Sequence, residues 1–198
     1  MKNRTATIER KTGETDVRLT LGLDGSGVGT RVTGVGFLDH MLDLLARHGR
    51  LDLDVKVEGD LETGAHHTAE DTAIALGQAL DQALGDRAGI TRYGAATVPM
   101  DEARASCAID ISGRPFTLFE AQLPPGSTGG FEHELTEEFF RALANAAKLT
   151  LHLRVQAGTN AHHMIEATFK AFARALREAV SIDPTEDGVP STKGTLTT

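Results

Sequence analysis

The sequence predicts an α+β protein made of a duplicated β-β-β-α-β-α half-domain, and three observations lead to this prediction. Segments in which every second residue is apolar predict strands, and segments with apolar residues three or four apart predict helices. The pattern His-His-X-X-Glu occurs twice, at 66–70 and at 162–166, and each copy opens a predicted helix. Equivalent points of the two halves keep nearly the same offset along the chain, which indicates an internal duplication.

The first half begins with two strands joined by a turn at 12–14, because apolar residues such as Val17 and Leu19 alternate with polar ones. Gly49 and Gly85 each follow an apolar helical stripe, where glycine is favoured as a C-terminal cap. The predicted strands are 3–12, 15–24, 29–34 and 51–57, and the predicted helices are 37–48 and 66–84.

The second half repeats this order, with a Pro- and Gly-rich loop at 124–130 before its first helix. The predicted strands are 92–98, 103–111, 116–121 and 149–155, and the predicted helices are 132–147 and 162–180. We therefore divide the chain into half-repeats at 1–90 and 91–182, which together form one catalytic unit. Residues 183–198 have no periodicity and are rich in Pro, Thr and Gly, so their composition predicts a disordered tail.

Composition narrows the class of protein. Of the 198 residues, 40% are hydrophobic, which suffices for a core without any tryptophan. The formal net charge of −8 argues against a broad surface for nucleic acid or anionic membranes. The single cysteine, Cys107, cannot form an internal disulfide, which favours a reducing compartment. Because there is no signal-peptide pattern at Met1 and no apolar run of about 20 residues, we expect a soluble cytoplasmic protein.

The two His-His-X-X-Glu copies predict metal binding. A helix places residues i and i+4 on one face, so His66 points with Glu70, and His162 points with Glu166. The neighbouring histidine of each pair lies about 100° further round the helix. One metal ion could not easily bind both histidines of a pair, so the pattern predicts two metal ions, each shared between the two helices.

Each half also supplies a histidine early in its first predicted helix, which gives six histidines and two glutamates in all. Imidazole and carboxylate without thiolate suit Mn, Fe, Co, Ni or Zn, and leave open positions for substrate or water on an octahedral ion. A pseudo-twofold arrangement predicts two sets of ligands. One set is His66, Glu70, His133 and His163, and the other is His162, Glu166, His40 and His67.

Other residues have simpler interpretations when each is considered alone. His48 has a weaker claim to metal binding, and His152 alternates with apolar neighbours, which places it on the polar face of a strand. From the residues alone, a dinuclear hydrolase of phosphate or amide bonds is the leading function. A metal-nucleated storage or structural assembly is the alternative, and it would leave Glu14, Arg92, Arg114 and Lys193 as ordinary surface residues.

Several stretches resemble the imidazoleglycerol-phosphate dehydratase family of histidine biosynthesis, and they cover nearly the whole chain in the family's order. They are FLDHMLDLLARHG (37–49), HHTAEDTAIALGQAL (66–80), GITRYG (89–94), DISGRP (110–115), FEH (131–133), NAHHMIEATFKAFARAL (160–176) and PSTKG (190–194).

The resemblance implies a metal centre, a fold and an assembly. The implied fold is a duplicated half-domain similar to ribosomal protein S5 domain 2. The implied assembly is a 24-subunit shell built from trimers, with active sites between subunits and two Mn²⁺ ions per site. The implied metal ligands are His40, His66, His67, Glu70, His133, His162, His163 and Glu166.

The resemblance also implies how a small phosphate substrate is held. The implied substrate-binding residues are Glu14, His48, Arg92, Arg114, Ser191, Thr192 and Lys193. The tail would order over the substrate, with Lys193 as a point charge on phosphate. Leu44 stands where relatives often have a glutamine of the phosphate pocket, so this chain would hold phosphate with one contact fewer. We expect dehydration alone, since the phosphatase domain fused to some bacterial relatives is not in this sequence.

The implied reaction converts D-erythro-imidazole glycerol phosphate to imidazole acetol phosphate. The C–H bond that breaks has no neighbouring carbonyl, so the imidazole ring must help. Bound to metal as imidazolate, the ring can expel the hydroxyl of the attached carbon and give a diazafulvene-like intermediate. Loss of the neighbouring proton, with Glu14 or a metal-bound water as carrier, would give an enol that becomes the ketone.

Overall fold

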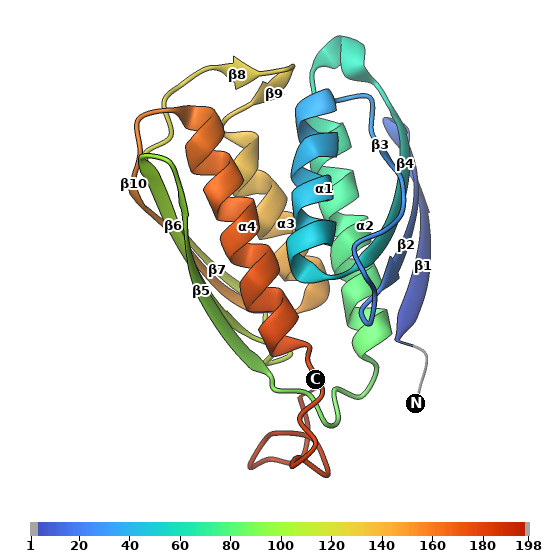
Figure 1. Cartoon of the computed structure of the whole chain (residues 1–198). Helices are drawn as coiled ribbons and strands as arrows, with labels where there is room; N and C mark the ends of the chain where they lie inside the picture. Colours follow the sequence, from blue (N-terminus) through green and yellow to red (C-terminus); the bar gives the residue numbers. More distant parts are fainter. Residues whose placement is uncertain (1–3, 197–198) are drawn as a thin grey trace.

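The computed structural model describes residues 4–196 of the chain. Figure 1 shows two twisted sheets on the outside, with four α-helices between them. The first half contains β1 (Thr5–Lys11), β2 (Thr15–Gly22), β3 (Arg31–Val32), α1 (Gly36–Gly49), β4 (Asp52–Gly59), the 3₁₀ helix η1 (Leu61–Thr63) and α2 (His66–Leu84).

The second half repeats this order of elements, with a two-stranded ribbon inserted before its first helix. It contains β5 (Tyr93–Met100), β6 (Ala103–Asp110), β7 (Phe116–Glu120), β8 (Ser127–Thr128), β9 (Phe131–Glu132), α3 (Leu135–Ala147), β10 (Thr150–Ala157) and α4 (Ala161–Ala179).

The two sheets have the same topology, which confirms the predicted duplicated α+β fold. Their strand orders are β1-β2-β4-β3 and β5-β6-β10-β7. In each sheet the third strand of the half pairs in parallel with the fourth, and the remaining pairs are antiparallel. The alternation of apolar and polar residues has its expected effect, since one face of each sheet is buried under helices.

Three local predictions were wrong. Gly49 lies within α1, and Arg50 is the residue that caps it in the left-handed region at φ 53°. The strand predicted at 29–34 is only two residues long, because Gly29 and Gly34 adopt positive φ angles of 123° and 81°. His133 does not lie in a helix, since the preceding residues pair in β9 and α3 begins only at Leu135.

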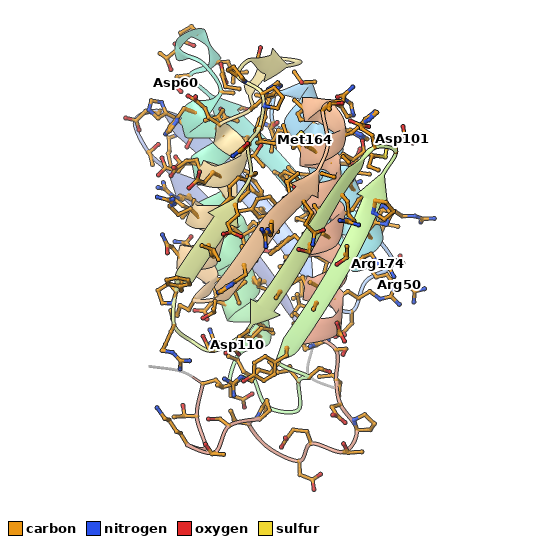
Figure 2. The ribbon with its side chains drawn as sticks, turned by 90° about the vertical axis from the view of Figure 1, so that its left-hand side faces the viewer. Arg50, Asp60, Asp101, Asp110, Met164 and Arg174 are labelled. Carbon is orange, nitrogen blue, oxygen red and sulfur yellow. The ribbon has the colours of Figure 1, made fainter. Side chains whose placement is uncertain are left out.

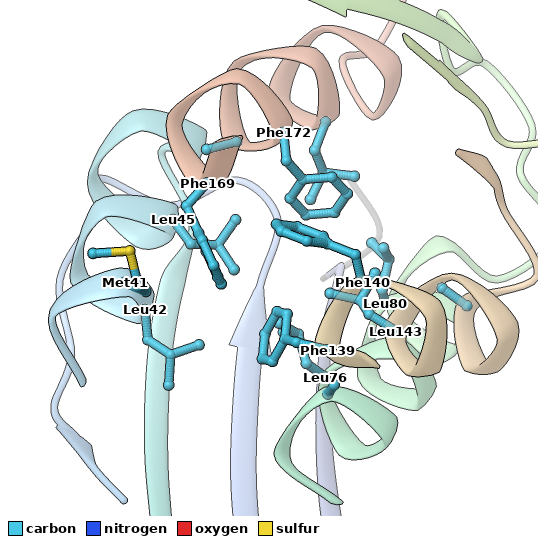
Figure 3. Close-up of a cluster of buried hydrophobic side chains, with 14 of the residues drawn as sticks. Met41, Leu42, Leu45, Leu76, Leu80, Phe139, Phe140, Leu143, Phe169 and Phe172 are labelled. Atoms are coloured by element: carbon cyan, nitrogen blue, oxygen red, sulfur yellow. The ribbon is translucent and has the colours of Figure 1, made fainter. Parts of the chain in front are cut away.

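Each His-His-X-X-Glu helix packs against the first helix of the other half, so α4 lies against α1 and α2 lies against α3. The interior between the helices is filled by phenylalanine and leucine, including Phe139, Phe140, Phe169 and Phe172, all fully buried (Figure 3). Gly77 allows α2 to approach α3 closely, because a Cβ atom there would lie 2.5 Å from the backbone oxygen of Leu143 on α3. The four helices therefore form one core that spans both halves.

Residues 183–196 of the tail make specific backbone contacts with the rest of the chain, which their composition did not predict. Asp183 N donates to Gly89 O, and Gly89 N donates to Gly188 O. Arg87 is fully buried and donates to the backbone oxygen of Leu196, while its other nitrogen pairs with Asp81. The tail is thus fastened by its backbone to the segment between α2 and β5.

None of the helices among residues 4–196 is both long enough and apolar enough to cross a membrane.

Candidate metal centre

Two imidazoles and a carboxylate meet at the N-terminal ends of α1 and α4. Glu166 Oε2 lies 3.1 Å from His162 Nε2 and 3.4 Å from His40 Nε2, and one ligand atom from each residue lies within 4.8 Å of the others. Among residues 4–196 no other group of three His, Cys, Asp or Glu side chains comes this close together. Nitrogen and carboxylate donors without thiolate suit a divalent first-row metal ion, so the residues present fit one.

Helix packing and local geometry explain why these three residues meet. The i, i+4 spacing on α4 brings His162 over Glu166, as the sequence predicts. The packing of α1 against α4 brings His40 from the other half of the chain. The buried ring of Phe37 lies edge-on to the ring of His162, with 5.0 Å between centroids, and limits the rotation of that imidazole.

Glu166 is buried and charged. Burial opposes its ionisation, but the hydrogen bond and charge of Lys170, with hydrogen bonds from His40 and His162, outweigh this and lower the pKa of Glu166. Lys170 Nζ pairs with Oε1, which leaves Oε2 facing the two imidazoles. Glu166 is therefore an anion with one oxygen directed at the place where a cation would bind.

The second histidine of the α4 pair faces another direction, as expected for adjacent helical residues. The rings of His162 and His163 are 81° apart in orientation. His163 Nδ1 lies 2.7 Å from Glu102 Oε2, and Glu102 also accepts from the backbone nitrogen of Asn160 at 2.8 Å. The hydrogen bond from His163 is the largest cause that lowers the pKa of Glu102 to about 2, and the same contact raises the pKa of His163.

The α2 pair is arranged in a related way. His67 Nδ1 lies 3.0 Å from Asp60 Oδ2, and this contact is the main cause that raises the pKa of His67. The backbone nitrogen of Asp60 donates to the backbone oxygen of Glu14, so the β1–β2 turn lies beside this histidine. The carboxylate of Glu14 also contributes to the raised pKa of His67. Glu14 therefore lies at the same end of the molecule as the expected metal ligands.

The other predicted set of ligands is not brought together within one chain. His66 is exposed, and the side chain of Glu70 makes no hydrogen bond or ion pair with any residue in 4–196. His133 is buried, with Nδ1 2.7 Å from Pro124 O and Nε2 2.9 Å from Thr128 Oγ1. His67 is likewise absent from the group formed by His40, His162 and Glu166.

Apart from His48, the predicted phosphate-binding residues lie at the opposite end of the molecule. Arg92 N donates to Ala179 O at the end of α4, and its guanidinium pairs with Asp110 and donates to Pro190 O. In Figure 2, Asp60 and Asp101 lie at one end of the molecule and Asp110 lies at the other. At 1.5 Å per residue, the stretch of α4 from His162 to Ala179 is roughly 26 Å long.

The remaining members of this second group lie around the same end. Arg114 follows β6 and is exposed, and its backbone nitrogen donates to Ser112 Oγ. Ser191, Thr192 and Lys193 form a turn in which Gly194 N donates to Ser191 O. The side chains of Thr192 and Lys193 point to solvent. Leu44 packs partly buried against the core, and its side chain has no polar group that could bind an anion.

His48 lies near the end of α1 among cations. Burial is the largest cause that lowers its pKa, followed by the charges of Lys170 and Arg174, while Glu166 acts in the opposite direction. At neutral pH the imidazole is therefore uncharged and able to accept a hydrogen bond. An anion bound beside these cations would weaken their effect on His48.

A duplicated α+β fold with imidazole and carboxylate side chains gathered at the helix starts defines a metalloprotein without thiolate ligands. Comparison with known proteins specifies this class further. Residues 33–176 match the family profile described as imidazoleglycerol-phosphate dehydratase. The chain belongs to this family of metal-dependent lyases of histidine biosynthesis, and it is an enzyme.

The similarity to relatives extends over nearly the whole chain. The chain is 57% identical over 194 residues to the imidazoleglycerol-phosphate dehydratase of Moorella thermoacetica, covering 98% of this chain and 99% of that protein. The corresponding protein of Symbiobacterium thermophilum is 58% identical over 196 residues, covering 99% and 94%.

Solved structures agree with the fold. The structure of imidazoleglycerol-phosphate dehydratase from Staphylococcus aureus matches with a TM-score of 0.82 and 40% identity, over 90% of this chain and 99% of that one. The enzyme from Pyrococcus furiosus, crystallised with the compound (S)-C348, also matches with a TM-score of 0.82, at 34% identity, over 95% and 99%.

Sequence reasoning missed four residues around the candidate centre. Lys170 could have been found, because it lies one helical turn after Glu166, where ion pairs form. Phe37 could not be told from an ordinary core residue by its sequence pattern. Asp60 and Glu102 carry no local signal, since their contacts with His67 and His163 depend on how loops and helices meet.

We predict that His48 titrates below 6.5 and that replacing Arg174 by glutamine raises its pKa, because one of the cations that disfavour the imidazolium is removed. The measurement is an NMR titration of the metal-free protein, with His48→Gln to assign the signal. Inorganic phosphate should shift the pKa in the same direction. If neither Arg174→Gln nor phosphate changed the pKa of His48, the nearby cations would not be what lowers it.

Proposed function

We propose that the chain dehydrates D-erythro-imidazole glycerol phosphate to imidazole acetol phosphate, using two Mn²⁺ ions in each active site. The observation that carries the proposal is the group of His40, His162 and Glu166, built by two halves of a chain that aligns with dehydratases over nearly its full length. These three residues would hold the ion through two imidazole nitrogens and one carboxylate oxygen. Further positions would remain for a fourth protein ligand and for substrate.

The fourth ligand of each ion would come from another copy of the chain. We assign His67 of a neighbouring subunit to the group His40, His162 and Glu166. By the pseudo-twofold relation, the second ion would take His66, Glu70 and His133, together with His163 of a neighbour. His67 and His163 support this assignment, because both lie near the surface at the metal-binding end and neither faces the group of its own chain.

The separation of the two groups of residues supports active sites between subunits. The expected metal ligands of α4 lie at its start, and Arg92 and the tail lie at its end, roughly 26 Å away by the rise per residue. A substrate with three carbons between its ring and its phosphate cannot span this length. We therefore propose a homo-oligomer, with the trimer-based 24-subunit shell as its form, in which one subunit supplies the metal end and another supplies Arg92, Arg114 and the tail.

Bound manganese would supply Lewis acidity that lowers the pKa of the substrate's imidazole ring. The electron-rich ring can then expel the hydroxyl of the attached carbon, through the diazafulvene-like intermediate. Glu14 lies beside Asp60 and His67 on an exposed turn, so it can reach a substrate bound between subunits and move the proton of the adjacent carbon.

The phosphate would be held by the cations at the far end. Asp110 holds the guanidinium of Arg92 in place and raises its pKa, which leaves Arg92 fully charged. Ser191 and Lys193 are carried by a tail that Arg87 and Arg92 fasten through backbone oxygens. These contacts place the charges before substrate arrives and so reduce the entropy lost on binding.

Metal removal tests the proposal directly. We expect the purified protein to form a ketone from imidazole glycerol phosphate, to lose this activity with a chelator, and to recover it with Mn²⁺. Light scattering should show smaller particles without metal, because shared ligands would join subunits. Turnover that survives complete metal removal, or phosphate-ester hydrolysis in place of ketone formation, would refute the proposed reaction.

Replacing Glu14 by glutamine removes the proposed proton carrier and keeps the shape of the turn. We expect kcat to fall by about two to four orders of magnitude, the range of general acid–base catalysis. Manganese content and particle size should not change, since the side chain of Glu14 makes no contact with the expected ligands of its own chain beyond its charge on His67. Unchanged kcat would remove Glu14 from the mechanism.

Mixing two inactive variants tests whether active sites lie between subunits. Glu14→Gln affects the metal end, and Lys193→Ala affects the exposed tail at the other end. After metal removal, mixing and reassembly with Mn²⁺, some sites would combine an intact Glu14 with an intact Lys193 from different subunits. We expect part of the activity to return. Each variant reassembled alone is the control, and no recovery in the mixture would contradict shared sites.

A further inference from the structure

The second histidine of each His-His-X-X-Glu copy is held by a carboxylate that lies outside the expected ligand set. Asp60 Oδ1 and Oδ2 lie 3.2 and 3.0 Å from His67 Nδ1. Glu102 Oε2 lies 2.7 Å from His163 Nδ1. In both cases the contact is made at Nδ1.

Both carboxylates are themselves fixed. Glu102 Oε1 accepts from Asn160 N at 2.8 Å and from Thr159 N at 3.2 Å, which ties it to the residues just before α4. Asp60 Oδ2 accepts from Thr63 Oγ1 at 3.0 Å, and Asp60 N donates to the β1–β2 turn. Each histidine therefore meets an acceptor whose position is set by the backbone around it.

The contact determines which ring nitrogen can bind a metal. A carboxylate accepts only from a protonated nitrogen, so the neutral imidazole carries its proton on Nδ1 and its lone pair on Nε2. His40 and His162 also direct Nε2 at the candidate centre. The four histidines thus present the same nitrogen, and metal-binding histidines commonly use such a carboxylate to fix their tautomer and orientation.

We propose that Asp60 and Glu102 are positioning residues that hold His67 and His163 with Nε2 presented to an ion shared with another subunit. This inference rests on the proposed function. It predicts a role in metal affinity for two carboxylates that do not themselves touch the ion. Neither belongs to a recognisable metal-binding motif in the sequence.

The two halves reach this contact from different positions in the fold, which argues for a functional requirement. Asp60 follows β4 just before η1, whereas Glu102 lies between β5 and β6. The counterpart of the β5–β6 turn in the first half is the β1–β2 turn, whose Glu14 makes no hydrogen bond to His67. Simple copying of an ancestral half would have placed both carboxylates at one position.

A purely structural role explains the contacts less well. His67 and His163 have 43% and 26% of their side chains exposed, and exposed ion pairs contribute little to stability. Asp101 offers a comparison, since its Oδ2 lies 3.8 Å from His163 Nε2, beyond hydrogen-bonding distance, on a side chain that is 74% exposed. The close contact of His163 is therefore the one between its Nδ1 and Glu102, whose carboxylate is itself held by the backbone.

The test measures Mn²⁺ affinity and histidine tautomers in the full-length protein. Glu102→Gln and Asp60→Asn keep the size of each side chain but can donate to Nδ1 as well as accept from it. We expect each to weaken Mn²⁺ binding by about 10- to 100-fold and to raise the metal concentration needed for assembly. Nitrogen NMR of the metal-free protein at alkaline pH should show a loss of the Nδ1–H tautomer at His163 or His67.

Matched controls separate position from charge. Glu120→Gln makes the same charge change at the exposed end of β7, and Glu62→Gln makes it on exposed η1 near Asp60. Both should leave Mn²⁺ affinity within about twofold of the parent, the scale of small surface effects. Adding Glu102→Gln to His163→Ala should cause no further loss, because Glu102 acts through that ring.

The outcomes distinguish this inference from the proposed function. If the parent protein binds Mn²⁺ and the Glu102 and Asp60 variants bind it equally well, the inference is overturned and the proposed function stands. An additive loss in the His163→Ala background would also overturn it. If the parent protein binds no metal and forms no ketone, the proposed function fails first and the inference falls with it.

Discussion

The arrangement of the candidate centre depends on the packing of each His-His-X-X-Glu helix against the first helix of the opposite half. This packing between the halves places His40 of α1 beside His162 and Glu166 of α4, so neither half alone could form the group. Buried aromatic residues such as Phe140 and Phe169 fill the space between the helices, and close-packed interiors resist small shifts. The packed core of the whole chain therefore holds the side chains of the candidate centre in place.

The length of α4 is the second constraint. Its start carries the imidazoles and Glu166, and its end receives Arg92 and the tail. Charges roughly 26 Å apart along a helix are separated by about three Debye lengths at physiological salt, so the two ends hardly influence each other within a chain. Under the proposed function, a single copy would hold two half-sites, which would become one site only where the metal end of one subunit meets the phosphate end of another.

The sequence predicted the features that depend on local periodicity. Both His-His-X-X-Glu helices, the alternating strands and the repeated order were found as expected, and the group formed by His162 and Glu166 follows from helical spacing. Features set by distant contacts were not predicted. Arg87 would be expected at the surface from its residue type, but it is buried and binds the tail. His133 lies before α3 because β9 pairs with β8. The contacts of Asp60 and Glu102 are equally non-local.

The duplication did not make two identical metal groups. On α1 and α4 the donor atoms already face one another, with Glu166 ionised beside them. In the other group of expected ligands, both nitrogens of His133 are engaged by Thr128 and Pro124, so in the proposed centre this ring would exchange a hydrogen bond for a metal bond. Such an exchange costs about 1 kcal/mol, far less than metal binding commonly provides. In the proposed assembly the two groups would therefore differ, since one would need only an ion and a neighbour, and the other would also have to rearrange.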